Sequence, residues 1–524
     1  MKRPLLGLLL LLLLALPVRA QDAFTGALPG LAGGFADIAT AVERLGAAGD
    51  PRALPVLRAL QEGRLQKAGD GRILLPEGAG LVDAATGQPA EAAGAGAEAV
   101  RLNNRVRQAL RGALGRLQIL SPDPAERQAA AEAVFRSRSA ENVPVLRQAL
   151  ARETVPRIRT QLELALAASQ LVGTDEAGKR DAVARLGSAG TVEARALLLE
   201  ARGGNPDLVT AIDVSIATIE RTLSLRRAAE TLFQGLSLGS VLLLAALGLA
   251  ITFGVMGVIN MAHGEFVMLG AYATFLVQEF CRGIPWLAPW SLALSVPAAF
   301  LVTAAAGALL ERGLIRHLYG RPLETLLMTF GVGMILQQAV RLAFGAQNRE
   351  VLSPAWMQGT LLLPGGISVT QNRLWIIVFG LAVLLLVFAA IRLTRFGLEM
   401  RAVVQNRRIA ATMGIRTGRV DAMTFAFGSG LAGLAGVALS QIDNVSPNLG
   451  TGYIIDSFMV VVFGGVGSLA GTLVGAMTLG IVNKMLEPWA GAVLAKVFVL
   501  IAIMLFIQRR PKGLFALKGR AAES

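Results

Sequence analysis

The chain divides into two halves with different patterns of apolar and polar positions. Residues 21–230 mix apolar positions with frequent Arg, Glu and Asp, whereas residues 231–508 hold long apolar stretches with few charges. Most of these stretches reach the roughly 20 residues that a helix needs to cross a bilayer. They lie near residues 231–253, 255–280, 289–311, 323–345, 375–393, 419–441, 453–484 and 492–508. The pattern predicts an all-α protein, with a soluble helical domain at 21–230 and a polytopic transmembrane helix bundle at 231–510.

The first twenty residues have the pattern of a secretory signal. Lys2 and Arg3 precede an apolar run from Leu5 to Leu16, and the small residues Val18 and Ala20 follow. The run is too short for a comfortable membrane span, which needs roughly 20 residues. We expect a signal peptide at 1–20, with an uncleaved anchor as the alternative. In both cases the soluble domain lies outside the cytoplasm, in the periplasm.

Three segments of the soluble half share one pattern. Residues 41–60, 133–150 and 182–201 each read as a helix, a short turn and a second helix. One such pair cannot bury its apolar stripe alone, so stacked neighbours are expected. The domain is therefore predicted to be a HEAT-like helical repeat. In 69–90, turns alternate with short apolar runs, which predicts an inserted β-hairpin.

The links between apolar segments differ in charge. Basic stretches are expected in the cytoplasm by the positive-inside rule, and they lie at 311–321, 392–419 and 508–520. Links with few Lys or Arg fit the outside, and they lie at 281–289, 346–373 and 442–452.

A count of crossings constrains the end of the bundle. If 453–484 were one simple span, the basic tail would end outside. The glycine-rich stretch 464–471 interrupts it, so we expect a broken, re-entrant helix that turns there and a cytoplasmic tail at 511–524. Broken helices of this kind mark substrate pathways in transporters.

Composition excludes several classes of function. The formal net charge is +14, but no basic face studded with aromatic residues accompanies it, so no nucleic-acid partner is expected. With one cysteine, Cys281, and two histidines, His263 and His317, neither a disulfide nor a cysteine or multi-histidine metal site is expected. Residues 173–180 resemble a phosphate loop, but Arg180 stands where Ser or Thr should hold magnesium. We expect no cofactor, metal or catalytic residues, and any ATPase must be another chain.

Several motifs resemble the branched-chain amino acid permease family of ABC importers. GLSLGS stands at 235–240 and INMAHGE at 259–265, and matching stretches follow in the family's order at 325–345, 397–415 and 460–482. The helical domain ahead of the permease resembles the urea-transport permease subgroup. The resemblance implies a multi-pass permease in a bacterial inner membrane. It further implies as partners a second homologous permease subunit, two cytoplasmic ATPase subunits and a periplasmic substrate-binding protein.

The second apolar segment carries the candidate translocation site. His263 and Glu265 are ionisable groups deep within it, and such groups in a membrane are functional candidates by default. The alternative is a polar clasp between helices. We expect the translocation path to be lined by residues of this segment and of other stretches that resemble the family. These residues are Asn260, His263, Gly264, Glu265, Thr329, Gly331, Gly464, Gly465, Gly467 and Ser468.

The basic stretch 397–415 has helix-forming composition. By resemblance it is the coupling helix that seats in a groove of an ATPase subunit, and the alternative is a solvated basic loop that holds orientation. The residues expected to act there are Gly397, Arg401, Gln405, Asn406, Arg407, Ala410, Ala411 and Gly414.

The sequence thus predicts a transport permease rather than an enzyme. The expected cargo is a small polar solute, urea or a short amide, moved by alternating access. A branched-chain amino acid permease is the alternative within the family. A passive channel or an intramembrane receptor is the alternative from another class.

Overall fold

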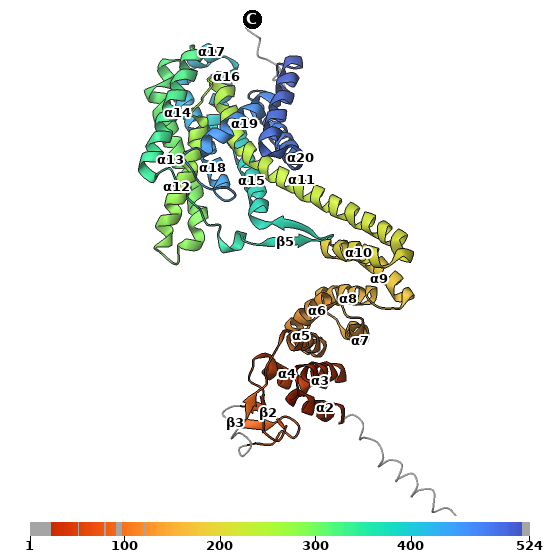
Figure 1. The fold of residues 1–524 in the computed structure, drawn as a ribbon. Helices are drawn as coiled ribbons and strands as arrows, with labels where there is room; N and C mark the ends of the chain where they lie inside the picture. The colour runs from red at the N-terminus through yellow and green to blue at the C-terminus, as the bar shows by residue number, and fades with distance from the viewer. Residues whose placement is uncertain (1–21, 51, 78–79, 91–96, 120, 516–524) are drawn as a thin grey trace, which may run out of the picture. The chain divides into compact units, whose positions relative to one another are not determined.

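The computed structural model describes residues 22–50, 52–77, 80–90, 97–119 and 121–515. The predicted signal peptide at 1–20 and most of the predicted tail lie outside these ranges. One compact unit ends at Ser224 and a second begins at Leu225, inside the long helix α11 (Val209–Met256). Figure 1 labels the α-helices of both units and the strands β2, β3 and β5.

Helices make up most of the first unit. The predicted helix–turn–helix pairs appear as α3–α4, α6–α7 and α9–α10, and apolar clusters fill the space between successive helices. That they are HEAT-like stays a prediction. The helices are α2 (Asp22–Ala27), α3 (Phe35–Ala48), α4 (Ala53–Gln61), α5 (Asn104–Gln118), α6 (Pro124–Ser137), α7 (Val143–Arg152), α8 (Pro156–Leu171), α9 (Glu176–Ala189) and α10 (Val192–Gly204), with 3₁₀ turns η1 (Leu28–Ala32), η2 (Ala140–Asn142) and η3 (Pro206–Leu208).

A small sheet interrupts the helices between α4 and α5. Strands β2 (Ile73–Glu77) and β3 (Gly80–Asp83) pair antiparallel, as the predicted hairpin requires. Two short strands, β1 (Gln66–Lys67) and β4 (Glu98–Ala99), extend it in the order β3-β2-β1-β4.

Residues 173–180, which resemble a phosphate loop in sequence, contain the N-terminus of helix α9. Asp175 caps α9 by accepting a hydrogen bond from the Ala177 backbone N–H at 3.1 Å. Lys179 bonds to Glu176 and to Asn205. The lysine is therefore held by neighbouring side chains of the same unit.

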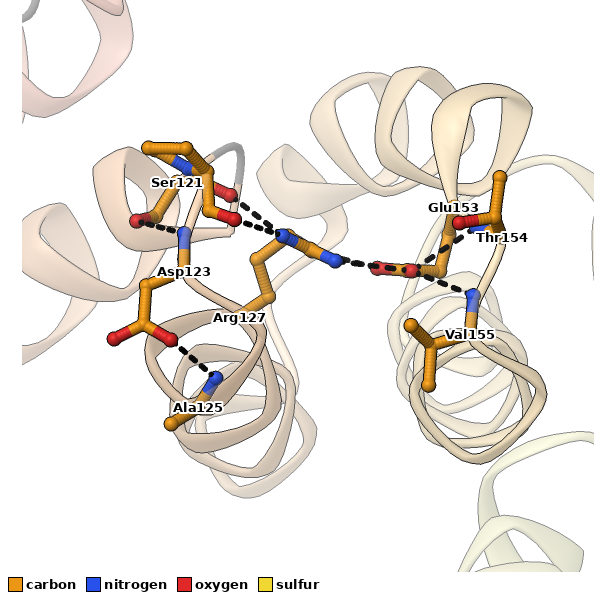
Figure 2. A network of polar contacts seen from close by, with 8 residues as sticks. Ser121, Asp123, Ala125, Arg127, Glu153, Thr154 and Val155 are labelled. Carbon is orange, nitrogen blue, oxygen red and sulfur yellow. Dashed lines mark hydrogen bonds and ion pairs between the residues drawn. The ribbon is translucent and has the colours of Figure 1, made fainter.

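A buried ion pair ties α6 to the turn between α7 and α8 (Figure 2). Arg127 Nε donates to Glu153 Oε2 at 2.7 Å, and Arg127 Nη2 donates to Glu153 Oε1 at 3.2 Å. Glu153 Oε1 also accepts hydrogen bonds from the backbone N–H groups of Thr154 and Val155. The Glu153 side chain is 1% exposed. The hydrogen bonds from Arg127 and from these amides hold the pKa of Glu153 below its usual value.

The second unit is a helix bundle. Its helices after α11 are α12 (His263–Arg282), α13 (Ser291–Gly313), α14 (Pro322–Phe344), α15 (Gln371–Leu393), α16 (Arg395–Gln405), α17 (Arg407–Thr412), α18 (Thr417–Leu439), α19 (Leu449–Gly464) and α20 (Leu469–Arg509), with η4 (Ala288–Trp290), η5 (Ile315–His317), η6 (Ala355–Met357) and a hairpin of β5 (Thr360–Leu363) and β6 (Ile367–Thr370). Within the described residues, six helices are long and apolar enough to cross a membrane: those containing α11, α13, α14, α15, α18 and α20. The polytopic all-α prediction is confirmed.

The apolar stretch predicted as one span at 255–280 is divided. Helix α11 ends at Met256, residues 257–262 form a loop, and α12 begins only at His263. Gly257 has φ +68°, which favours glycine and ends α11. Helix α12 is not among the six candidate spans, because it carries charged residues as well as apolar ones.

The predicted break at 464–471 is present. Helix α19 ends at Gly464 and α20 begins at Leu469. Gly465 and Gly467 have φ of +102° and +82°, and Ser468 caps α20 by accepting from the Gly471 N–H at 3.1 Å. That this turn is re-entrant in a membrane stays a prediction.

Helix α20 reverses direction at Gly491, whose φ of 78° and ψ of 162° are not helical. A straight helix of 41 residues would separate its ends by about 60 Å. Instead both ends lie beside the same turn, because the Leu514 N–H donates to the Phe463 carbonyl at 2.9 Å. The two halves of α20 thus run in opposite directions, which brings the chain back to the side it left.

Four of the five tryptophans of the chain stand in or beside links with few basic residues, with Trp375 in the first two turns of α15, and the fifth stands near the reversal of α20. Each is at least 44% exposed. Such a distribution is typical of an aromatic belt at a membrane interface. The residues are Trp286, Trp290, Trp356, Trp375 and Trp489.

Glycines bring three helices of the bundle, α11, α12 and α18, into backbone contact. A Cβ at Gly270 of α12 would collide with the backbone of Gly433 of α18, and one at Gly248 of α11 would collide with Gly428 of α18. Close approach of this kind is the usual basis of helix association in membranes. The packing of α18 therefore fixes where α11 and α12 lie.

Glu153→Gln should loosen the first unit near α6 and the α7–α8 turn. Loss of a charged, buried hydrogen-bond partner costs about 2 kcal/mol, which makes local opening roughly 30-fold more frequent. Because the folded pKa of Glu153 is lowered, its contribution is present above about pH 4.3 and is lost as the pH falls through the folded pKa. Hydrogen exchange followed by mass spectrometry on the full chain measures this opening.

The control for this variant is Glu132→Gln, which removes an exposed pair with Arg136. We expect no change in exchange there. Equal exchange in wild type and Glu153→Gln at neutral pH would contradict the role of the buried pair.

Gly433→Val should prevent normal assembly of the bundle, because its side chain would overlap Thr303 and the Ala299 carbonyl. Gly331→Val is the matched control, since a Cβ there meets open space. The measurement is thermal unfolding of detergent-purified protein by tryptophan fluorescence. Equal melting temperatures for the two variants would show that the close packing of α18 is not required.

Candidate functional site

The start of α12 lies in the middle of the bundle. His263 Nε2 donates a hydrogen bond to the carbonyl oxygen of Ala245 at 2.8 Å. Ala245 is near the centre of the apolar part of α11, so α12 begins half-way along a spanning helix. Asn260 and His263 are each 1% exposed and Glu265 is 8% exposed. The sequence-predicted polar residues are thus brought together and buried.

Each of these three side chains keeps a polar atom without a partner among the described residues. Asn260 Oδ1 accepts from the Ala262 N–H at 3.0 Å, but Asn260 Nδ2, His263 Nδ1 and Glu265 Oε2 have no hydrogen bond. Buried polar atoms are nearly always paired, because an unpaired one costs about 1–3 kcal/mol. The clasp alternative accounts for the contact of His263 with α11 only. One donor, one carboxylate oxygen and one imidazole nitrogen remain available to a ligand.

A second helix begins at the same place. Gly264 and Gly450 are so close that a Cβ on either would collide with the backbone of the other. Gly450 is the second residue of α19. The N-termini of α12 and α19 therefore meet, and each carries partial positive charge from its unpaired N–H groups.

Helix α14 closes one side of the site. Thr329 Oγ1 accepts a hydrogen bond from the Met261 N–H at 3.1 Å. A Cβ at Gly333 would lie 3.5 Å from Glu265 Cγ, whereas Gly331 faces open space. Two residues along a helix turn about 200°, so Gly331 points away from the face shared by Thr329 and Gly333. The sequence analysis did not name Gly333 as a site residue. The spacing of four residues between Thr325, Thr329 and Gly333 places them on one face of a helix and could have indicated it.

The glycines of the 464–468 turn form a separate group. Helix α19 has 16 residues and is about 24 Å long, so its two ends are far apart. A Cβ at Gly254, near the end of α11, would lie 2.7 Å from the Cα of Gly467, so this turn packs against α11. The turn also pairs with the end of the described chain, because the Phe515 N–H donates to the Gly464 carbonyl at 3.1 Å. The predicted path residues thus fall at two levels of the bundle.

The basic stretch predicted as one helix at 397–415 is two short helices, α16 and α17. Asn406 separates them in extended conformation, with φ −155° and ψ 105°, and its Oδ1 accepts from the Ile409 N–H at 3.0 Å. An asparagine that caps a new helix ends the preceding one. The prediction of one coupling helix over residues 397–415 was therefore wrong in its boundaries.

Most of the predicted coupling residues are on the surface. Arg401, Gln405, Asn406, Ala411 and Gly414 are exposed, whereas Gly397 and Ala410 are buried against the bundle. The sequence analysis missed two apolar side chains one turn apart on this surface: Ile409 is 59% exposed and Met413 is 79% exposed. Arg407 is directed towards Asp421 of α18 instead of away from the bundle.

Comparison with known proteins agrees with this architecture. Residues 231–508 match the family described as branched-chain amino acid transport system / permease component. The chain belongs to this permease family. It is 30% identical over 294 residues to the high-affinity branched-chain amino acid transport system permease protein LivH of Salmonella typhimurium, a match that covers 54% of this chain and 94% of LivH.

Other relatives match about half of this chain. The permease protein BraD of Pseudomonas aeruginosa is 29% identical, with 48% of this chain and 84% of BraD covered. The ribose import permease protein RbsC of Escherichia coli is 25% identical, with 49% of this chain and 77% of RbsC covered. No solved structure matches the chain.

Membership has consequences for the whole molecule. These relatives are named transport permeases and not enzymes. The chain is accordingly a multi-pass permease of the inner membrane, and membership in an ABC importer family implies ATPase and binding-protein partners. The first unit lies outside the matched region.

Proposed function

We propose that this permease moves a small polar solute by alternating access through the start of α12, powered by separate ATPase subunits. The observation that carries the proposal is the group of unpaired polar atoms on Asn260, His263 and Glu265, buried half-way along α11. An unpaired buried polar atom is a cost to the fold unless a ligand or a second conformation satisfies it. Two helices that begin at mid-depth are typical of transporter substrate sites.

The chemistry of the site favours urea or a short amide. The Asn260 amide can donate to a carbonyl oxygen, and the Glu265 carboxylate can accept from N–H groups. Within the described residues Glu265 forms no ion pair, and no Lys or Arg side chain is bonded to Asn260 or His263. A zwitterion would need a cationic partner for its carboxylate, whereas a neutral amide needs only donors and acceptors.

A branched-chain amino acid is the second candidate. It is favoured by the names of LivH and BraD, which are the permeases of branched-chain amino acid systems. The partial positive charge of two helix N-termini could hold a carboxylate in place of a cationic side chain.

The assembly that fits this function has a second homologous permease subunit, two cytoplasmic ATPase subunits and a periplasmic substrate-binding protein. In this arrangement residues 21–230 face the periplasm and the C-terminal tail faces the cytoplasm. The exposed surface of α16 and α17 then seats on an ATPase subunit, with Ile409 and Met413 as its apolar contacts.

Uptake in a strain lacking the native gene distinguishes the two substrates. Cells that express this permease with its partner proteins receive labelled urea or labelled leucine. ATP-dependent accumulation of urea alone supports the neutral-amide site, and accumulation of leucine alone assigns the second candidate. Accumulation that continues in cells depleted of ATP would contradict an ATP-driven permease and indicate a passive channel.

Glu265→Gln should reduce uptake at least tenfold without lowering the amount of protein in the membrane, because it removes the carboxylate and keeps the size of the side chain. The matched control is Glu279→Gln on the same helix, where the carboxylate pairs with Arg282 at the surface. Uptake by Glu265→Gln equal to that of the control would remove Glu265 from the path.

Ile409→Asp should weaken binding of the ATPase subunits at least tenfold, because it places a charge in an apolar contact. The side chain is 59% exposed, so the permease itself should fold normally. Co-purification of the ATPase subunits measures the binding, and size-exclusion chromatography checks the fold. Unchanged co-purification would mean that this surface is not the ATPase contact.

A further inference from the structure

Two carboxylates are buried close to the basic links. The Asp421 side chain, in the second turn of α18, is 0% exposed, and Glu311, near the end of α13, is 2% exposed. Removing a carboxylate from water is costly unless a well-placed partner compensates. Both carboxylates are satisfied by one group of neighbouring side chains.

Arg407 of α17 is the partner of Asp421. Its Nη1 donates to Asp421 Oδ1 at 3.1 Å, and its Nη2 bonds to Asp421 Oδ2. Such a bidentate pair fixes orientation as well as distance. The guanidinium carbon of Arg407 also lies 5.1 Å from the centre of the Tyr319 ring, in cation–π contact.

Tyr319 continues the chain of contacts. Its hydroxyl donates to Glu311 Oε1 at 3.0 Å. The contacts therefore run from Glu311 through Tyr319 and Arg407 to Asp421, and they join α13, the link before α14, α17 and α18. We call these four residues the Arg407 cluster.

The cluster connects the surface of α17 to the polar site through α18. Arg407–Asp421 is the one ion pair between α16 or α17 and other helices in the part of the chain that the structure describes. Gly428, seven residues after Asp421 in α18, is in backbone contact with Gly248 of α11. A Cβ at Gly248 would also lie 2.9 Å from His263 Cε1. Helix α18 is thus bound near its N-terminus by the ion pair with Arg407, and its centre packs close to His263.

We propose that Arg407 and Asp421 are positioning residues that transmit the movement of α17 to α18, and through α18 to the start of α12. The proposal rests on the proposed function, because it assigns the part that carries ATPase-driven movement to the solute site. A rigid helix with a bidentate hold at one end and backbone contacts at its centre moves as one body. A salt bridge that only stabilised the fold would not affect how much transport each ATP yields.

The test is a proteoliposome assay of the complete complex, with the ATPase subunits and the binding protein present. Both ATP hydrolysis and solute uptake are measured, and their ratio is the readout. Asp421→Asn keeps the size of the side chain but loses the charged bidentate pair. We expect ATP hydrolysis within about twofold of wild type and uptake per ATP at least tenfold lower.

Two further variants sharpen the assay. Arg407→Lys keeps the charge but not the fork geometry, and we expect a partial loss of uptake per ATP. Arg419→Ala is the matched control, since Arg419 is exposed in the first turn of α18, near Asp421 but outside α16 and α17, and forms no ion pair among the described residues. It should give the wild-type ratio.

Tyr319→Phe covers the case in which Asp421→Asn fails to assemble. It removes only the hydrogen bond to Glu311, and we expect uptake per ATP to fall roughly threefold. Wild-type ratios in Asp421→Asn, or in Tyr319→Phe where Asp421→Asn does not assemble, would overturn the linkage and leave the proposed function standing. A wild-type complex that takes up solute without ATP would overturn the proposed function and the linkage together.

Discussion

Backbone contact between glycines of α11, α12, α18 and α19 is the constraint on which the rest of the bundle depends. At Gly270 with Gly433 and at Gly264 with Gly450, no side chain larger than hydrogen fits. In a membrane, helices gain little from apolar burial and must associate by close packing. The contacts hold α12 so that its first turn, with His263 and Glu265, lies in the protein interior instead of in lipid.

This arrangement links local chemistry to transport. A helix that begins inside the bundle exposes N–H groups and polar side chains where a continuous helix would present only apolar ones. Asn260, His263 and Glu265 retain unpaired atoms at this point. The neighbouring helix α18 passes the site, and Asp421 in its second turn pairs with Arg407 of α17, next to the surface that we assign to the ATPase contact. Helix α18 therefore borders both the solute site and the surface that we assign to the ATPase contact.

Local sequence predicted what local residues control. The long apolar stretches gave the spanning helices, and Gly465 and Gly467 gave the turn between α19 and α20. Errors arose where a short-range signal inside a helical pattern was overlooked, as with Asn406, which caps α17 and divides the coupling segment.

Contacts between distant segments could not be predicted in this way. The pairing of Arg407 with Asp421 requires α17 and α18 to be folded against each other, and the placement of Gly333 beside Glu265 requires α14 to pack on α12.

The most direct test of the central claim is thiol labelling of Asn260→Cys in a Cys281→Ala background. We predict that a small impermeant reagent reaches position 260 from opposite sides of the membrane with and without ATP, and that solute protects it; no labelling in either state would contradict a solute path at the start of α12.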